Sequence, residues 1–207
     1  MMTIESKYIL SFTAASLRLN EMVKVALAAQ DNGSSDLNVV KESGVVFGSV
    51  KNRTTDREFR EIRKRLEKLT HEQKNILIHG DLNSQKQIAF LAVCKHYAFI
   101  MDYTIEVIRD KVLLFDYQLH ESDYNSFINS KILLHPELEE FSESTRKKAK
   151  QVMYRILEQA GIINNAVEKT IQPQILQQDV INALVKEDPV WLKIFMMSDR
   201  DIKQLRH

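Results

Sequence analysis

The sequence is poor in the residues that interrupt regular structure, with five glycines and three prolines among 207 residues. Collagen and folds of many short strands need such residues every few positions, so these classes are excluded. A glycine-rich phosphate-binding loop is excluded too, because the glycines stand apart at positions 33, 44, 48, 80 and 161. A hydrophobic share of 44% is too high for a disordered chain, which leaves a helical globular protein.

Cysteine is almost absent as well. Cys94 is the only one, so the chain contains no internal disulfide, and a zinc site built on thiolates is not expected. The first residues, Met1–Lys7, lack the apolar stretch of a signal peptide. The most apolar segment, Ile88–Met101, contains Lys95 and His96 and is shorter than the ~20 residues that span a bilayer. We therefore expect a cytoplasmic protein with no membrane partner.

Hydrophobic spacing predicts helices along nearly the whole chain. They are expected at Phe12–Gln30, Asp36–Lys41, Asp56–Leu69, Glu72–Ile78, Asp123–Leu133, Pro136–Glu140, Thr145–Ala160 and Gln177–Lys186. The predicted N-caps are Ser11 or Thr13, Asn83 or Ser84, and Ser144 or Thr145. Residues 84–116 contain no glycine or proline and form either one helix or two with a break near Asp102. The sequence leaves both possibilities open.

These elements predict an all-α fold in two parts. Residues 1–118 are expected to form an N-terminal helical bundle around the apolar 84–116 stretch, and residues 119–207 a C-terminal domain. In the second part a helix, a short helix, a turn, a basic helix, Gly161 and a short hairpin follow one another. This is the order of a winged helix-turn-helix, with Thr145–Ala160 as the recognition helix.

The net charge of +1 conceals two basic segments. Residues 51–68 hold eight basic and four acidic side chains, a net of +4, and residues 142–158 hold five and two, a net of +3. The rest of the chain holds 16 basic and 22 acidic side chains, a net of −6. Because a phosphate backbone responds to local charge, the average near zero does not exclude a nucleic-acid partner.

Helical geometry, at ~100° per residue, gives each basic segment an apolar face and a basic face. The predicted core residues are Phe59, Ile62, Leu66 and Leu69 in the first helix, and Ala149, Val152, Met153, Ile156 and Ala160 in the second. The residues predicted to face away are Arg57, Arg60, Lys64 and Lys68, and then Lys147, Lys150, Gln151 and Tyr154, flanked by Lys148 and Arg155. The segments also echo each other at an offset of 90, so that Thr54-Thr55 matches Ser144-Thr145 and Arg65 matches Arg155.

Hydroxyl side chains and free N–H groups at the start of a helix can bind phosphate oxygens, while later turns reach a groove. The residues predicted to contact DNA are Lys51, Arg53, Thr54, Thr55, Arg57, Arg60, Lys64, Lys68, Ser144, Thr145, Arg146, Lys147, Lys148, Lys150, Gln151, Tyr154 and Arg155. The alternative is that both are ordinary surface helices, because the four acids of the first could pair with its bases at i,i+4.

Four stretches carry a family resemblance: Tyr8–Leu17, Asn52–Leu66, Leu91–Tyr97 and Ser142–Gly161. Together they resemble the BrxA family of BREX bacteriophage-exclusion systems. The resemblance implies a non-enzymatic, mostly helical, cytoplasmic protein that binds double-stranded DNA beside a BREX methyltransferase and ATPases. It also suggests an N-terminal bundle similar to the antitermination factor NusB, which binds RNA.

No catalytic residues, metal or other cofactor are expected. Asp102, Glu106 and Asp110 recur at i,i+4, but no histidine or neighbouring base completes a nuclease-like set, so a solvated acidic stripe is the better interpretation. Three hypotheses remain: duplex DNA binding, which leads, a protein-interaction scaffold that bridges defence subunits, and RNA binding by the N-terminal bundle.

Overall fold

The computed structural model describes residues 7–31 and 53–205, and in these ranges every regular element is helical. The helical elements are η1 (Ser11–Ala14), α1 (Leu19–Asp31), α3 (Arg53–Glu67), α4 (His71–His79), α5 (Leu82–His96), α6 (Ala98–Tyr103), η2 (Thr104–Arg109), α7 (Asp110–Leu113), α8 (Glu121–Ile132), α9 (Glu137–Glu140), α10 (Glu143–Gln159), α11 (Gln178–Glu187), η3 (Pro189–Phe195) and α12 (Asp199–Gln204). Two isolated antiparallel bridges are the only β pairing in these ranges. The predicted all-α class is confirmed, while the predicted Asp36–Lys41 helix lies outside the described residues.

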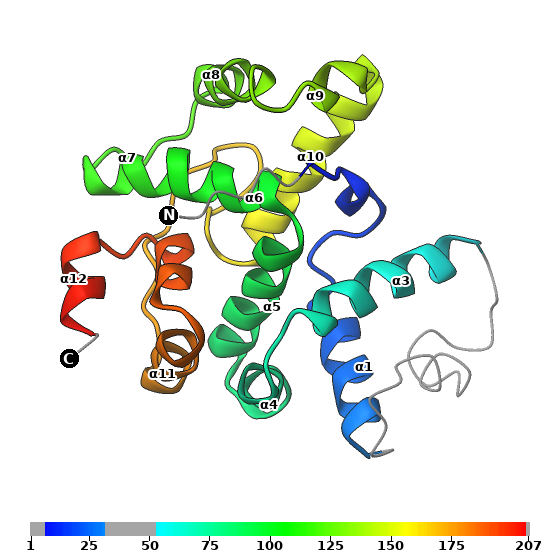
Figure 1. Cartoon of the computed structure of the whole chain (residues 1–207), viewed down its shortest axis with the longest axis vertical. Helices are drawn as coiled ribbons and strands as arrows, with labels where there is room; N and C mark the ends of the chain where they lie inside the picture. The colour runs from blue at the N-terminus through cyan, green and yellow to red at the C-terminus, as the bar shows by residue number, and fades with distance from the viewer. Residues whose placement is uncertain (1–6, 32–52, 206–207) are drawn as a thin grey trace.

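Helix α5 forms the centre of the molecule (Figure 1). Its residues Ile88–Cys94 are at most 1% exposed, and a helix that is apolar on every side must be covered on every side. Helices α1, α3, α4, α6 and α11 and the turn η3 all pack against it. Its N-cap is Asp81, whose carboxylate accepts from the Ser84 N–H at 2.7 Å, so the predicted cap at Asn83 or Ser84 is wrong.

The 84–116 stretch forms two helices, and the break lies at Tyr97 rather than near Asp102. Tyr97 is extended, with φ −120° and ψ 94°, because its buried hydroxyl donates to Glu61 and its ring packs on Phe12. From Ala98 to Leu113 the chain then stays helical through a π-helical turn, η2. Within the described residues no single helix is long and apolar enough to cross a membrane; α5 and the Ala98–Leu113 helix meet that test only together, bent by 115°.

The predicted helix from Phe12 to Gln30 is wrong in its first third. Between η1 and α1 the chain is irregular, and Arg18 has a φ of 55°. The reason is Arg65, whose guanidinium donates to the carbonyls of Ser16 and Ala15 at 2.6 Å each and to that of Leu17 at 3.3 Å. An α-helix would use these carbonyls for its own i→i+4 bonds.

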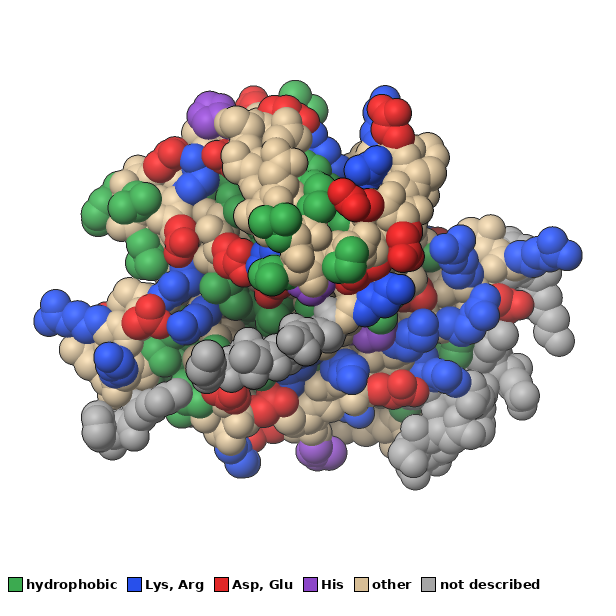
Figure 2. Space-filling model, turned by 45° about the horizontal axis from the view of Figure 1, so that its top comes forward, with side chains coloured by type: hydrophobic (Ala, Val, Ile, Leu, Met, Phe, Trp, Pro, Cys, Tyr) green, Lys and Arg blue, Asp and Glu red, His purple; other side chains and the backbone are tan. Residues whose placement is uncertain are grey.

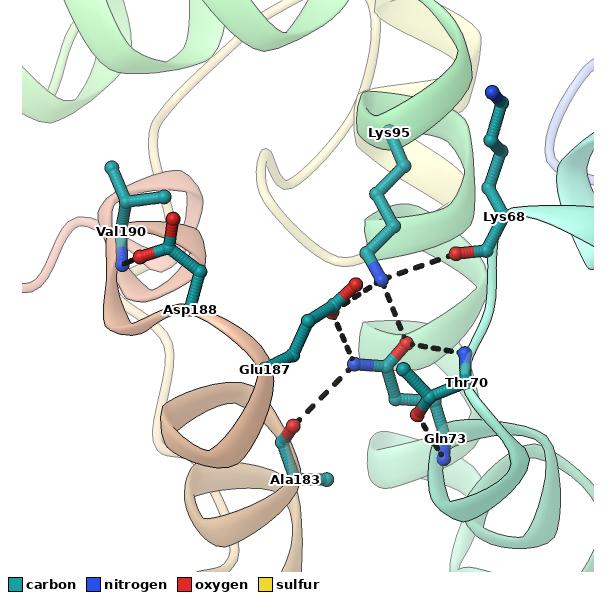
Figure 3. A network of polar contacts seen from close by, with 8 residues as sticks. All are labelled: Lys68, Thr70, Gln73, Lys95, Ala183, Glu187, Asp188 and Val190. Atoms are coloured by element: carbon teal, nitrogen blue, oxygen red, sulfur yellow. Dashed lines mark hydrogen bonds and ion pairs between the residues drawn. The ribbon is translucent and has the colours of Figure 1, made fainter. Parts of the chain in front are cut away.

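The C-terminal elements return to the N-terminal bundle through a polar network around Lys95 (Figure 3). The Lys95 ammonium binds the Glu187 carboxylate, the Gln73 side-chain oxygen at 2.9 Å and the Lys68 carbonyl at 3.2 Å. The Gln73 amide donates to Glu187 at 2.8 Å, which joins α4, α5 and α11. Burial lowers the pKa of Lys95, and Glu187 opposes that shift. Apolar residues from both sides of Leu119 form one continuous core, and the predicted domain boundary there stays a prediction.

Replacing Arg65 by alanine should destabilise the fold by about 3 kcal/mol, because the side chain is fully buried and three carbonyls would lose their donor. Urea denaturation followed by circular dichroism measures the loss. Arg60→Ala on the exposed face of the same helix is the matched control and should change stability by no more than about 0.5 kcal/mol. Equal losses in the two variants would contradict the role of Arg65.

Candidate nucleic-acid interface

Helix α10 buries one face and exposes a basic one. Its buried residues are Ala149, Val152, Met153, Tyr154, Ile156 and Leu157. Its opposite face runs through Ser144, Lys148, Gln151 and Arg155, at i, i+4, i+7 and i+11, with Lys147 beside it, and all five are exposed. Within the described residues, the basic side chains of Arg146, Lys147, Lys148 and Arg155 form no ion pair. Their charge is therefore available to an anion from outside.

Two residues predicted to face away from the core on this helix do not. Tyr154 is 3% exposed and shares a hydrogen bond with the Tyr103 hydroxyl at 3.0 Å. Lys150 pairs with Glu121 of α8, and its ammonium lies 4.9 Å from the centre of the Tyr124 ring. Both lie at the edge of the apolar face, where Glu121 and Tyr124 of α8 contact the helix. This prediction of their orientation is wrong.

The helix begins two residues earlier than predicted, so the predicted cap at Ser144 or Thr145 is wrong. The N-cap is Ser142, whose hydroxyl accepts from the Thr145 N–H at 3.2 Å. The same hydroxyl lies 3.0 Å from that of Ser144 and 2.9 Å from that of Thr145. The paired hydroxyl residues therefore lie in the first turn, beside Arg146 and Lys147, with Ser144 facing solvent.

The other end of α10 leads into the predicted hairpin. Gly161, with φ 76°, ends the helix, and the N–H groups of Gly161 and Ile162 donate to the carbonyls of Glu158 and Leu157. Ile163 then pairs antiparallel with Ile171, and Thr170 pairs with Gln118, which precedes α8. Three short extended segments thus lie side by side, with the one around Thr170 in the middle.

Lys169 stands at the turn of this hairpin and was not among the predicted residues. Its ammonium lies 5.0 Å from the centre of the Tyr154 ring, so the hairpin sits against α10. The predicted hairpin could have indicated Lys169, because a basic side chain on the wing of such a fold lies beside the recognition helix.

Helix α3 presents a second basic stripe. Its members are Arg53, Arg57, Arg60 and Lys64, continued by Lys68 just after the helix, at spacings of four, three, four and four residues. From Arg53 to Lys64 the stripe is about 17 Å long, the rise of roughly five base pairs. Among described residues, Arg53, Arg57, Arg60 and Lys68 have no ion-pair partner, while Lys64 lies 3.5 Å from Glu61. Lys51 lies outside the described residues.

Most of the acidic side chains of α3 form their contacts away from this stripe. Glu58 pairs with Arg18 of the preceding segment. The buried Glu61 accepts from the Tyr97 hydroxyl and from the Ser11 hydroxyl at 3.1 Å. Glu67 forms an i,i+4 pair with Arg63 at 3.3 Å. Pairing within the helix therefore neutralises little of the stripe.

The sequence similarity between the two basic segments is not matched by similar positions of their side chains. The threonines Thr54 and Thr55 lie inside the first turn of α3 instead of before it, with Thr54 exposed and Thr55 half-buried. Arg65 is fully buried against backbone carbonyls, whereas its counterpart Arg155 is exposed. The two helices share their composition, and each presents its own set of bases.

A common support holds both helices. Turn η1 packs against α3 and α10 alike. Beyond it, the Leu17 N–H donates to the Gln159 side chain of α10 at 2.9 Å, while the Leu17 carbonyl accepts from Arg65 of α3. The two helices extend toward the same side of the molecule with η1 between them (Figure 1). In Figure 2, lysine and arginine side chains gather over α3 at the right of the view.

Two members of the acidic series in the centre of the chain, Asp102 and Glu106, are held by other contacts. Asp102 accepts from the Tyr8 hydroxyl at 2.5 Å, and Lys131 binds Asp102 at 3.4 Å and Glu106 at 2.5 Å. Among described residues, no three histidine, cysteine, aspartate or glutamate side chains are grouped so that they could hold a metal ion.

Comparison with known proteins gives three kinds of match. The model of the BrxA family matches residues 6–188. "BREX protein BrxA" of Escherichia coli O9:H4 (strain HS) is 28% identical over 130 residues, 61% of each chain. The protein of the same name from Bacillus cereus (strain H3081.97) is 29% identical over 104 residues, 50% of this chain and 52% of that one. The matched regions thus span about three fifths and one half of these relatives.

A solved structure shares the fold. The crystal structure of an uncharacterized protein from Magnetospirillum magneticum has a TM-score of 0.78 and covers 92% of this chain and 98% of its own. The sequences are 20% identical, so this likeness concerns the fold alone.

Alkaline pH should weaken the attachment of α10 to the rest of the protein. Burial raises the pKa of Tyr103, Tyr124 and Tyr154 above the usual value. These hydroxyls stay neutral in the folded state at a pH where they ionise in the unfolded one, near pH 10 and above. Their contribution is present below pH 10 and is lost above it, by about 1.4 kcal/mol per pH unit for each tyrosine.

The variant Tyr154→Phe isolates one of these groups. We expect urea titrations between pH 9 and 11.5 to show a shallower loss of stability than in the original protein. At pH 7 the variant should lose about 1 kcal/mol, because Tyr103 loses its partner. An unchanged pH dependence of stability would contradict the placement of Tyr154.

Proposed function

The chain belongs to the BrxA family, and we propose that it is a non-enzymatic, DNA-binding component of a BREX bacteriophage-defence system. The observation that carries the proposal is the pair of exposed basic stripes on α3 and α10. Seven of their bases have no ion-pair partner within the described residues, and neither has Arg146 in the first turn of α10: the seven are Arg53, Arg57, Arg60, Lys68, Lys147, Lys148 and Arg155. Unpaired bases at regular spacing on two supported helices suit the phosphates of a duplex.

Helix α10 and the hairpin are proposed to act as a winged helix-turn-helix. The order of elements supports this: the Ala98–Leu113 helix, an extended piece at Gln118, α8, α9, α10 and the hairpin. The solvent-facing line of α10 suits a groove, since Gln151 can reach a base edge while Lys148 and Arg155 face the phosphates on either side. Lys169 on the hairpin would add a further phosphate contact.

Helix α3 is proposed to contact the sugar-phosphate backbone of the same duplex. Its stripe carries only arginine and lysine, whose charges suit phosphate contact. The description of the N-terminal bundle as similar to NusB remains part of the proposal. So does a cytoplasmic location, where DNA and the BREX methyltransferase and ATPases, the proposed partners, would be met.

The test is the combined reversal of Arg57, Arg60, Lys147 and Lys148 to glutamate. We expect fluorescence-anisotropy titrations against a duplex to show at least a hundredfold weaker binding at 0.1 M salt. The slope of log K against log salt should fall by about 0.9 for each phosphate that the variant no longer binds. Single-stranded RNA of equal length serves as competitor and should displace the duplex only weakly.

A matched control reverses four bases elsewhere: Lys86, Lys186, Arg200 and Lys203. Both variants change the net charge from +1 to −7, because each reversal removes two units from the charge of the chain. The control should retain affinity within about tenfold, since long-range repulsion is screened beyond about 10 Å at 0.1 M salt. Equal weakening in the two variants, or unchanged binding in both, would exclude the two basic helices as the docking surface.

A further inference from the structure

The turn that follows α7 exposes a group of apolar side chains, which we call the α7 turn surface: Leu113, Leu114, Phe115 and Tyr117. Leu114 is 78% and Phe115 81% exposed, so neither stabilises the core. Single exposed apolar residues are common, but here four fall within five positions of one turn. Hydrophobic side chains gather at this end of the molecule, at the left of the view in Figure 2.

Phe115 has a left-handed backbone conformation that a bulky side chain rarely adopts. Phe115 has a φ of 59° and ends α7: its own N–H donates to the Val112 carbonyl at 3.0 Å, and the Asp116 N–H donates to that of Lys111 at 2.9 Å. Helix α10 ends with the same pair of bonds, and there the left-handed residue is Gly161. Glycine is the usual residue at this position because a side chain is strained there.

An aromatic residue at that position brings strain without stabilising the fold. Its ring is in solvent, where a phenylalanine gains no burial. Backbone outliers of this kind cluster at ligand clamps and other functional sites. The ring is therefore best explained by a contact with another molecule.

The turn is also held in one shape. Lys111 binds the Asp116 carboxylate at 2.5 Å and reaches Asp123 of α8 at 3.4 Å. The other oxygen of the Asp116 carboxylate accepts from the Gln118 N–H at 3.1 Å. A surface that is already ordered loses little entropy when a partner binds.

The charges around the turn define the chemistry of the partner. Asp110 and Asp116 are exposed beside the apolar group, and within the described residues Asp110 has no ion-pair partner. The basic side chain in the turn, Lys111, is mostly buried and already paired with Asp116 and Asp123. Even with Lys111 paired, the charged side chains Asp110, Lys111, Asp116 and Asp123 sum to −2, which repels DNA phosphates and anionic lipid and attracts lysine and arginine.

We propose that the α7 turn surface docks a partner protein that presents an apolar pocket rimmed by lysine or arginine, with Phe115 as the anchor. The surface lies across the molecule from α3, so a partner can bind there while α3 faces a duplex (Figure 1). The proposal rests on the geometry of the turn and stands whether or not the basic helices bind DNA.

The test variant is Phe115→Gly, which removes the anchor and relieves the strained position, so its thermal midpoint should not fall. The probes are the purified BREX methyltransferase and ATPases of the same system, each titrated against fluorescently labelled full chain in the presence of nuclease. We expect one of them to bind, and Phe115→Gly to weaken that binding at least tenfold. Leu133→Ser, at an equally exposed leucine after α8, is the matched control and should bind within twofold of the original.

Four results would overturn the proposal. None of the probes binds the original chain, or Phe115→Gly binds as tightly as the original. Sedimentation shows that the original chain associates with itself and the variant does not, which would make a second copy the occupant. Finally, a tenfold weaker duplex affinity in Phe115→Gly would assign the surface to DNA. Unchanged duplex affinity together with weakened protein binding is the expected pattern.

Discussion

The buried guanidinium of Arg65 is the constraint on which the two basic helices depend. It gathers the carbonyls of three successive residues, Ala15 to Leu17, and keeps that segment out of a helix. The freed Leu17 N–H then reaches α10 through Gln159. One basic side chain of α3 is therefore structural, and its burial supports the helix whose other bases face solvent. A charge buried against three carbonyls is stable only while all of them stay in place, so this junction is rigid.

The positions of the acidic residues divide the surface into regions of different charge. On α3 the acids turn toward Arg18, Tyr97 and Ser11 and leave the outer stripe basic. On the α7 turn the arrangement is reversed: Lys111 is mostly buried, while Asp110 and Asp116 are exposed. A net charge of +1 thus arises from segregation, with two basic helices carrying +7 and the remainder −6. Such a molecule suits localised docking on DNA and a separate basic partner.

The sequence predicted most of this from local signals and missed what tertiary contacts decide. The all-α class, α4, α8, the Gly161 terminus and the exposed bases of α3 followed from periodicity and punctuation. The irregular segment before α1 could not be foreseen, because it depends on Arg65, about fifty residues away. Tyr154 and Lys150 were misplaced because they lie at the border of the apolar face, where the position of α8 decides burial. The break at Tyr97 likewise follows from a distant partner, Glu61.

The central claim is that α3 and α10 contact one duplex together. Acetylation footprinting measures it directly, by following the reactivity of each lysine by mass spectrometry in the free protein and in a 1:1 complex. The account predicts that Lys64 and Lys68 on α3 and Lys147 and Lys148 on α10 become protected at the same DNA concentration, while Lys186 and Lys203 stay reactive. Protection of only one helix, or equal protection of all six lysines, would contradict it.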